Sequence, residues 1–538
     1  MIIDDLRKIE ISQPIETDLC IVGSGPAGLT IAGEFAGTRV SVLILESGGL
    51  DEEASIDALN EIESVGAPRV MNQSLLRNRV VGGSSHTWTG RCAPLDEIDY
   101  TVRPWVPHSG WPIARHDLEP YFDRAAPHLG IALQGYDGRL WHRSGEPEVD
   151  TRLLRPCFWQ YSQGAIYPSR PMRFGPRFIR RTAPNIRLLH HATVRRVKLN
   201  EAATRLDSVI AIGPEGKTAT VRPKVLVLCA GGIETPRLLL CSNDVITAGV
   251  GNARDLVGRF LMDHPRCDAG EFDLAAADAV LDRLGRRRLA GKAGRPVYVH
   301  GLALSPALQE QRELLNCAAW LDTTVADDDP LYAAKQLLSG RDRRPVPGAL
   351  KIVSHPDLIL RGARDLWTRG GAVTRKYSRL TLQCTVEQEP DPQSRIRLAD
   401  RTDALGMPLS QIDWRVSDRE KDSVATLARL IADEFARIGF PVPRLADWIA
   451  RGRLDRAEFL DMAHPTGATR MALDPSEGVV DTNCQIHGVD GIFIAGSSVF
   501  PIGGHVNPTQ TILALAIRLA DRLKNHVFNV EPSAVAAQ

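Results

Sequence analysis

The sequence has no excess charge of either sign, no long apolar run and no paired-cysteine motif. Its 65 Lys and Arg residues balance 65 Asp and Glu residues, so net charge favours neither nucleic acid nor an anionic membrane as a partner. No stretch of about 18 uncharged apolar residues occurs, which predicts that no helix spans a membrane. With 43% hydrophobic residues over 538 positions, the composition is that of a globular protein with a sizeable core.

The nine cysteines are scattered without CxxC spacing, which argues against a zinc site or a redox dithiol. An odd number without a framework fits reduced thiols. The N-terminus has no charged segment followed by an apolar one, as a secretory signal would. We therefore expect a cytoplasmic protein without a bound metal, although a folded enzyme can be exported with a partner that carries the signal.

The order of strand-like and helix-like segments predicts more than one domain. The first fifty residues indicate strand, glycine turn, helix and strand. The middle of the chain contains strand-like YSRLTLQCTVEQ, SRIRL and QIDWRV and the amphipathic helix SVATLARLIADEFARIGF. We predict an α/β fold, with a Rossmann-like dinucleotide-binding domain and an α+β substrate domain built on an antiparallel sheet. The expected boundaries are 1–100, 190–266 and 454–538 for the first, and 101–189 and 267–453 for the second with its connecting segments.

A dinucleotide fingerprint lies in TDLCIVGSGPAGLTIAGEFAGTRVSVLILESGG. Gly23, Gly25 and Gly28 form GxGxxG between an apolar strand and a helix. The first glycine permits the tight turn, the second lets a pyrophosphate approach the backbone, and the third lets helix and strand pack closely. Glu46 ends the next strand, where a carboxylate accepts hydrogen bonds from an adenosine ribose. FAD and NAD share this fingerprint, so the motif alone does not choose between them.

Three further segments carry more specific information. Residues 77–100 read RNRVVGGSSHTWTGRCAPLDEIDY, in which small residues allow close approach to a planar ring or a pyrophosphate. Residues 228–243 read LCAGGIETPRLLLCSN, a strand, glycine turn and helix. Residues 464–523 begin HPTGATRM and continue through GIFIAGSSVFPIGGHVNPTQ.

With the N-terminal fingerprint, these segments resemble the glucose–methanol–choline (GMC) family of FAD-dependent oxidoreductases. VEQEPDPQSRIRLADRTDALGMPLSQIDW, PWVPHSGWPI and ARDLVGRFLMDHP are similar to its sugar- and polyol-oxidising branch, which is pyranose oxidase-like or glycoside oxidase-like. One departure is that the family's second signature usually ends in Ser-Gly, whereas this chain has Ser242-Asn243. Asn tolerates a positive φ, so the turn is expected to be kept.

The resemblance implies FAD, bound without a covalent link, in a site made of backbone and small side chains. The ADP half would contact the GxGxxG loop and Glu46, and the flavin would lie near the glycine pair and the C-terminal segment. The implied cofactor-binding residues are Gly23, Ser24, Gly25, Gly28, Glu46, Ser47, Arg79, Gly82, Gly83, Ser84, His86, Val194, Ala230, Gly496, Ser497, Asn507 and Thr509.

The resemblance also implies a catalytic pair, His464 and Asn507. Alcohol oxidation removes the hydroxyl proton while a hydride moves from carbon to flavin N5, and a neutral imidazole is suited to accept that proton. Asn507 can donate to the substrate oxygen without competing for the proton. His505 is the rival for the second place, because i and i+2 share a face in an extended segment.

Other candidates have weaker support. His86 follows the glycine pair, but family members with a covalent flavin carry their histidine one position later, where this chain has Thr87. Gln388 could project from the substrate sheet into the pocket. His264, in MDHP, is expected to be structural.

The function predicted from the sequence is FAD-dependent oxidation of an alcohol to a ketone or aldehyde, with His464 as general base. The favoured substrate is a sugar, a glycoside or a polyol. Alternatives are a non-sugar alcohol, such as a sterol, aromatic or secondary-metabolite alcohol, and a flavoprotein subunit of an electron-transfer complex. The electron acceptor, which could be O₂, a quinone or another compound, and the oligomeric state stay open.

Overall fold

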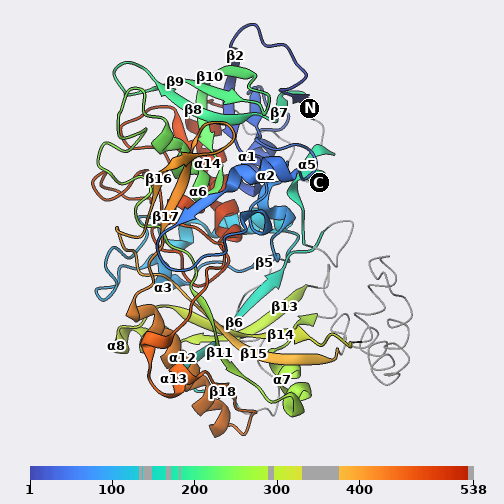
Figure 1. The fold of residues 1–538 in the computed structure, drawn as a ribbon, viewed down its shortest axis with the longest axis vertical. Helices are drawn as coiled ribbons and strands as arrows, with labels where there is room; N and C mark the ends of the chain where they lie inside the picture. Colours follow the sequence, from blue (N-terminus) through green and yellow to red (C-terminus); the bar gives the residue numbers. More distant parts are fainter. Residues whose placement is uncertain are drawn as a thin grey trace.

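Two large β-sheets lie one above the other along the long axis of the molecule (Figure 1). The computed structural model describes residues 1–132, 136, 148–164, 171–180, 183–288, 296–329 and 375–530. The upper part contains strands from the first and last segments of the chain, and the lower part is built mainly from the middle (Figure 1).

The upper sheet has eight strands in the order β1-β7-β3-β2-β10-β9-β8, with β19 paired to β10. Strands β1, β7, β3, β2, β10 and β19 pair in parallel, and β8, β9 and β10 pair antiparallel. The strands are β1 (Ile2–Asp5), β2 (Ile15–Val22), β3 (Val42–Leu45), β7 (Ile186–His190), β8 (Thr193–Leu199), β9 (Leu206–Ile212), β10 (Thr218–Leu228) and β19 (Ile492–Ile494).

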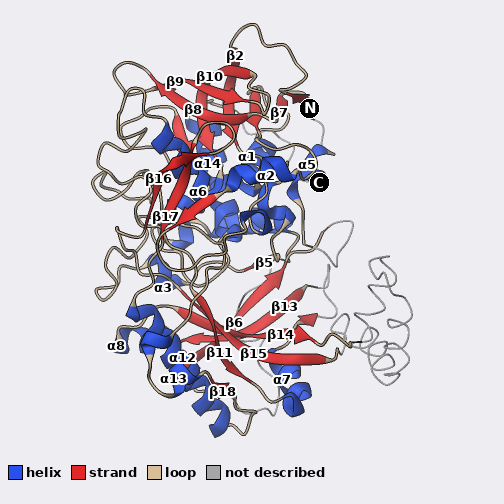
Figure 2. Ribbon diagram, viewed as in Figure 1, coloured by secondary structure: helices blue, strands red, loops and turns tan. Residues whose placement is uncertain are grey.

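The apolar runs of the sequence explain why these strands are central. The ends of β2, β3 and β10 are buried along consecutive residues, as expected for parallel strands covered on both faces. Helices cover the sheet in Figure 2, and α14 packs against both α1 and α4. The helices of this part are α1 (Pro26–Glu34), α2 (Ala54–Asp57), α3 (Glu97–Tyr100), α4 (Glu119–Leu129), α5 (Phe174–Ile179), α6 (Gly231–Cys241) and α14 (Thr509–His526). The predicted Rossmann-type α/β fold is confirmed.

The lower sheet also has eight strands, in the order β18-β11-β15-β14-β13-β6-β5, with β12 paired to β13. All its pairings are antiparallel. The strands are β5 (Arg91–Cys92), β6 (Leu154–Tyr161), β11 (Arg266–Glu271), β12 (Arg287–Arg288), β13 (Val297–Leu304), β14 (Cys317–Val325), β15 (Tyr377–Val386) and β18 (Arg444–Leu445).

The two faces of the lower sheet have different neighbours. Trp159, Trp320 and Ala303, which lie on one face, share a core with the upper part. Phe158 and Leu302, which point to the other face, belong to a separate core beneath the helices. Because side chains alternate along a strand, the two faces of this sheet contribute to two separate cores.

Helix α12 covers the outer face of the lower sheet, against β11, β14 and β15 (Figure 2). It spans Asp418–Arg437, and its apolar residues recur at helical spacing, so one stripe is buried. Ser417 and Glu420 form a capping box that defines its start. The smaller helices of this part are α7 (Ala277–Leu284), α8 (Pro306–Arg312) and α13 (Asp447–Ala450).

One expected arrangement differs from the structure. The strands predicted at SRIRL and QIDWRV are present as β16 (Arg395–Thr402) and β17 (Pro408–Asp413), but they do not join the lower sheet. They form a three-stranded sheet with β4 (Ile62–Ser64), against α6 of the upper part. Ile396 and Ile412 pack there with Ile233 of α6. The alternation of apolar and polar residues predicted both strands. It could not predict their pairing with β4, because β4 lies far away in the sequence. The boundaries between domains stay a prediction.

The nine cysteines are all buried and unbonded. Within the described parts of the chain, no helix combines the length and the apolar character needed to cross a membrane.

Candidate active site

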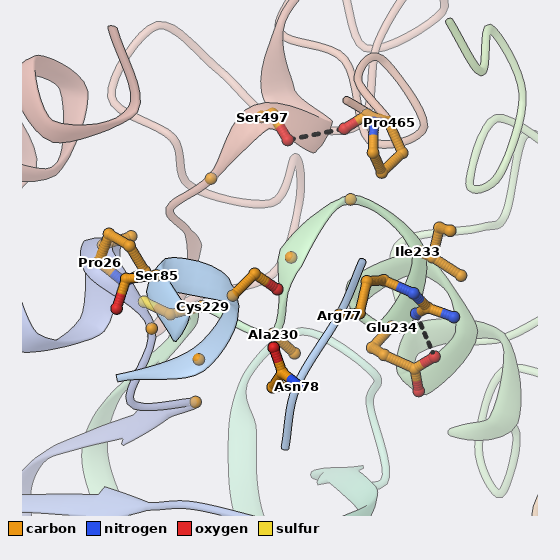
Figure 3. A pocket seen from close by; sticks show the side chains of 18 of the residues that line it. Pro26, Arg77, Asn78, Ser85, Cys229, Ala230, Ile233, Glu234, Pro465 and Ser497 are labelled. Atoms are coloured by element: carbon orange, nitrogen blue, oxygen red, sulfur yellow. Dashed lines mark hydrogen bonds and ion pairs between the residues drawn. The ribbon is translucent and has the colours of Figure 1, made fainter. Parts of the chain in front are cut away.

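A cavity of about 420 Å³ lies beside the carboxyl ends of β2, β3 and β10. Figure 3 shows its lining from the turn before α1, the segment near Arg77, the start of α6 and the C-terminal segment. The structure brings most of the predicted site residues to this cavity: Gly23, Gly25, Glu46, Ser47, Arg79, Gly83, Ser84, Val194, Ala230, His464, Gly496, Ser497, Asn507 and Thr509.

Three glycines on different segments leave room in the cavity. A Cβ added at Gly25, Gly231 or Gly496 would meet no atom of the described residues within 4 Å, so a side chain there would extend into the cavity. Gly25 precedes α1, whose first N–H groups and positive dipole end favour a phosphate. This lining fits the pyrophosphate of a dinucleotide, as the fingerprint predicts.

The other glycines of the fingerprint shape the turn. At Gly28 a Cβ would lie 2.0 Å from the carbonyl oxygen of Gly23, so only glycine lets α1 approach β2 this closely. Gly23 has a φ of +97°, which glycine adopts at low cost. Gly28 therefore acts through packing and does not line the cavity.

Glu46 is anchored at the end of β3. Its carboxylate accepts hydrogen bonds from the Ser24 amide (2.8 Å), the Ser24 hydroxyl (2.6 Å) and the Gly48 amide (2.8 Å). Burial raises the pKa of Glu46, and these hydrogen bonds oppose the rise. Ser24 thus supports Glu46 and does not line the cavity, while Glu46 keeps a place in the lining where a ribose hydroxyl can bind.

An arginine cluster forms a further wall of the cavity. Glu234 on α6 accepts from Arg77 (3.0 Å) and Arg79 (2.8 Å), and the Arg77 contact is drawn in Figure 3. Burial alone would raise the pKa of Glu234, but the positive charges of Arg237, Arg79 and Arg77 outweigh it and lower the pKa. Arg79 also donates to the Ser47 hydroxyl (3.0 Å), so both predicted residues belong to one rigid network.

His464 and Asn507 meet in the same cavity. Asn507 Nδ2 lies 3.2 Å from His464 Nε2, although the residues are 43 positions apart. Nearby, the Ser497 hydroxyl donates to the Pro465 carbonyl at 2.7 Å and joins the two C-terminal segments (Figure 3). The predicted pair is therefore assembled next to the dinucleotide lining.

The surroundings of His464 keep its imidazole neutral. Burial lowers the pKa of His464 to about 3, and the neighbouring His264 adds to this effect, although Asp263 acts in the opposite direction. The charges of Arg91 and Arg266 lower this pKa further. At neutral pH one ring nitrogen is thus unprotonated, as a proton acceptor must be.

His505 is not part of this lining. Its ring packs edge-on against Trp159, with centroids 6.1 Å apart, and neither buried ring nitrogen has a hydrogen-bond partner among the residues that the structure describes. Nδ1 lies 3.5 Å from a carboxylate oxygen of Asp96. The structure places Asn507, and not His505, beside His464.

Gln388 differs from expectation more clearly. Its side-chain oxygen accepts from the Asp263 amide (2.8 Å) and the Trp414 indole (2.7 Å), and its amide donates to the Arg415 carbonyl. It is 2% exposed and does not line the cavity. A polar residue at a strand end can equally satisfy neighbouring backbone, and here it supports Asp263.

His86 and Gly82 also lie outside the lining. The two ring nitrogens of His86 contact Glu52 (3.0 Å) and the Val81 carbonyl (3.3 Å). A Cβ at Gly82 would lie 2.7 Å from the Gly175 amide, so this glycine permits a close backbone contact. Both residues shape the loop that presents Gly83 and Ser84 to the cavity.

Two residues near the pair were missed as functional candidates. Arg91 lines the cavity from β5, donates to the Tyr161 hydroxyl (3.2 Å) and lies over the Trp320 ring at 5.0 Å. His264 contacts His464 directly, with 2.8 Å between the two Nδ1 atoms. Proximity to the glycine pair could have suggested Arg91, whereas no local pattern links His264 to a residue 200 positions away.

Asp5, His190 and His191 form a separate buried group whose candidate ligand atoms lie within 4.8 Å of one another. These atoms already have partners. Arg7 donates to both carboxylate oxygens of Asp5, and the two histidines contact each other at 2.8 Å. Glu53 contacts the second nitrogen of His191 at 2.7 Å. The group braces the strand end next to Glu46.

Comparison with known proteins agrees with this geometry. Residues 178–266 and 390–516 match the N- and C-terminal regions of the GMC oxidoreductases. The fructose dehydrogenase large subunit of Gluconobacter japonicus is 25% identical over 60% of this chain and 52% of its own length. The C-glycoside 3-oxidase of Arthrobacter globiformis is 25% identical over 82% of this chain and 73% of its own.

The fold is shared with a solved structure of formate oxidase. That structure superposes with a TM-score of 0.59 at 18% identity, covering 96% of this chain and all of the other. At this identity the likeness concerns the fold, and the family assignment follows from the two matched regions. The chain belongs to the GMC oxidoreductase family, and it is an FAD-dependent oxidoreductase that acts on CH–OH groups.

Proposed function

We propose that the protein oxidises an alcohol group of a sugar, a glycoside or a polyol, with His464 as the general base and Asn507 as its partner. The observation that carries this proposal is the contact of 3.2 Å between Asn507 Nδ2 and His464 Nε2 in a cavity that also contains the dinucleotide lining. The two relatives named for fructose and a C-glycoside support the substrate class.

Each residue has a defined task in this proposal. FAD, when bound, supplies the acceptor for the hydride of the alcohol carbon. His464 Nε2 takes the hydroxyl proton, because burial keeps this nitrogen unprotonated at neutral pH. Asn507 Nδ2 donates to the substrate oxygen and orients the alcohol. Gly25, Gly231 and Gly496, together with Glu46, would hold the ADP half of FAD, without a covalent link through His86.

On the side of the lower sheet, Arg91 lines the cavity and can donate hydrogen bonds to a substrate hydroxyl. Trp320 lies beneath the Arg91 guanidinium and supports its position from the core. The electron acceptor is left open between O₂ and a quinone or other compound. The nine unbonded cysteines support the cytoplasm as the proposed compartment.

The test is anaerobic mixing of the purified yellow protein with a panel of sugars, glycosides, polyols and non-sugar alcohols. A sugar, glycoside or polyol should bleach the flavin, and the product should contain a new ketone or aldehyde. His464→Ala should retain FAD and slow bleaching by about 10²-fold or more. His116→Ala, whose side chain is 80% exposed, is the control and should react at the normal rate. A normal rate in His464→Ala would remove that residue from the role of base.

A further inference from the structure

The two histidines at the cavity are aligned by paired backbone segments. Met262 bridges to Thr466 and Arg266 to Leu460, so residues 262–266 run antiparallel to residues 460–466. This pairing brings His264 beside His464. The distance of 2.8 Å between their Nδ1 atoms is that of a hydrogen bond.

One buried carboxylate fixes both segments. Asp263 Oδ1 accepts from the backbone amides of His264 (2.8 Å), Met462 (3.1 Å) and His464 (3.0 Å). Its other oxygen accepts from Arg69 Nη2 at 2.7 Å. Burial alone would raise the pKa of Asp263, but the charge of Arg69 outweighs it and lowers the pKa, so the carboxylate stays ionised. The relative position of the two imidazoles is therefore set before any substrate binds.

The donor and the acceptor of each hydrogen bond can be assigned by starting from Gly503, which contacts His264 on the side away from His464. The carbonyl of Gly503 can only accept, and it lies 3.2 Å from His264 Nε2, so that nitrogen carries a proton and donates. His264 is 1% exposed, and burial lowers its pKa, so its ring is neutral. A neutral ring with a proton on Nε2 has a lone pair on Nδ1.

The same reasoning extends to His464. Because His264 Nδ1 is an acceptor, His464 Nδ1 must be the donor across the 2.8 Å contact. The lone pair of neutral His464 is then on Nε2, the nitrogen that faces Asn507 and the cavity. The opposite tautomer would place a proton on Nε2 and leave no base on the substrate side.

We infer that His264 is a positioning residue that holds His464 in the Nδ1–H tautomer and so points its free nitrogen at the substrate hydroxyl. This inference rests on the proposed role of His464 as base. The hydroxyl proton passes to His464 Nε2, while the Nδ1 proton keeps donating to His264. His264 touches neither substrate nor cofactor in this arrangement.

The chain offers a matched pair of variants. In His264→Asn the side-chain oxygen occupies the position of Nδ1 and can still accept from His464. In His264→Gln the terminal amide occupies the position of Nε2, so it can donate to Gly503 but leaves His464 Nδ1–H without an acceptor. Both replacements are smaller amides, so a purely structural role would affect them alike.

We expect His264→Gln to slow anaerobic flavin reduction by about 10- to 100-fold, the usual loss when a group that orients a histidine is removed. His264→Asn should recover most of that loss. FAD content and thermal stability should be similar in the two variants. Equal rates in the pair, or a normal rate in His264→Gln, would overturn the inference.

A second readout does not depend on turnover. In ¹⁵N-histidine-labelled holoenzyme, the ring nitrogens of His464, assigned by comparison with His464→Ala, should show protonated Nδ1 and unprotonated Nε2. His264→Gln should shift His464 toward the other tautomer, and His264→Asn should not. An unchanged tautomer in His264→Gln contradicts the inference even if the rate falls. If His464→Ala reduces its flavin at the normal rate, the proposed function is wrong. That result differs from the outcomes that would contradict only the inference about His264.

Discussion

Two groups of residues that line the cavity contribute to the proposed function in opposite ways. Gly25, Gly231 and Gly496 provide space by having no side chain, and backbone groups are proposed to bind the cofactor there. His464 and Asn507 are proposed to act through side chains whose orientation is set by buried neighbours. We therefore expect the glycine group to lose its function when side-chain atoms are added, and the histidine group when hydrogen-bond partners are removed.

The largest effect, a loss of bound FAD, is expected when a side chain is added among these glycines. Gly25→Leu should give a folded protein, because Gly25 has an ordinary φ of −69° and the new side chain would not collide with neighbouring atoms. The protein should be colourless, because the side chain would fill the space proposed for FAD. FAD content after purification and circular dichroism measure this. Gly33→Leu on the same helix, where a Cβ also meets nothing within 4 Å, should keep its FAD. A yellow Gly25→Leu protein would contradict the proposed role of these glycines.

The buried His505, which packs beside the cavity lining without belonging to it, should make the fold sensitive to acid. Burial lowers the pKa of His505 to about 4, against the opposing effect of Asp96 and with smaller effects of Arg155 and His264. The unfolded chain binds this proton below about pH 6.5, whereas the folded protein binds it only below about pH 4, so the stability contributed falls as pH drops between those values.

His505→Phe should therefore flatten the loss of thermal stability between pH 6.5 and 4 by up to about 3 kcal/mol, since one pKa unit is about 1.4 kcal/mol. Phe keeps the edge-on contact with Trp159. Melting temperatures of wild type and variant across this range provide the measurement. Parallel curves would show that His505 is protonated equally in both states.

A smaller effect is expected at the partner of the base. Asn507→Ala should slow flavin reduction about fivefold, because a net neutral hydrogen bond contributes about 1 kcal/mol and about 1.4 kcal/mol is tenfold in rate. The loss should be smaller than in His464→Ala and should appear in the reduction rate at saturating substrate. A loss as large as that of His464→Ala would assign Asn507 more than an orienting role.

The smallest effect is expected at His86. Because its ring nitrogens contact Glu52 and the Val81 carbonyl and the residue is outside the cavity lining, acid precipitation should release all the flavin. His86→Ala should release the same fraction as wild type. Flavin that stays with the wild-type precipitate but not with the variant would show a covalent link.

The same contrast explains what the sequence could predict. GxGxxG and Glu46 are local signals, because the turn, the helix start and the strand end that make the site are contiguous in the chain. The pair of His464 and Asn507 could be predicted through the family resemblance of the C-terminal segment.

The residues that position His464 and Asn507 could not be predicted from the sequence. His264, Asp263 and Gln388 come together only through tertiary pairing of distant segments. In the same way, β17 pairs with β4 and not with the lower sheet. The alternation of apolar and polar residues identifies a strand but does not identify the strand that pairs with it.

The position of β11 has a mechanical consequence. This strand begins at Arg266, two residues after His264, and it belongs to the lower sheet. The lower sheet and the residue that contacts the proposed base are thus parts of one short length of backbone. Because Arg266 also bridges to Leu460, a displacement of that sheet would act on the segments of both histidines. The position of the proposed base is therefore coupled mechanically to the sheet that lies on the other side of the cavity.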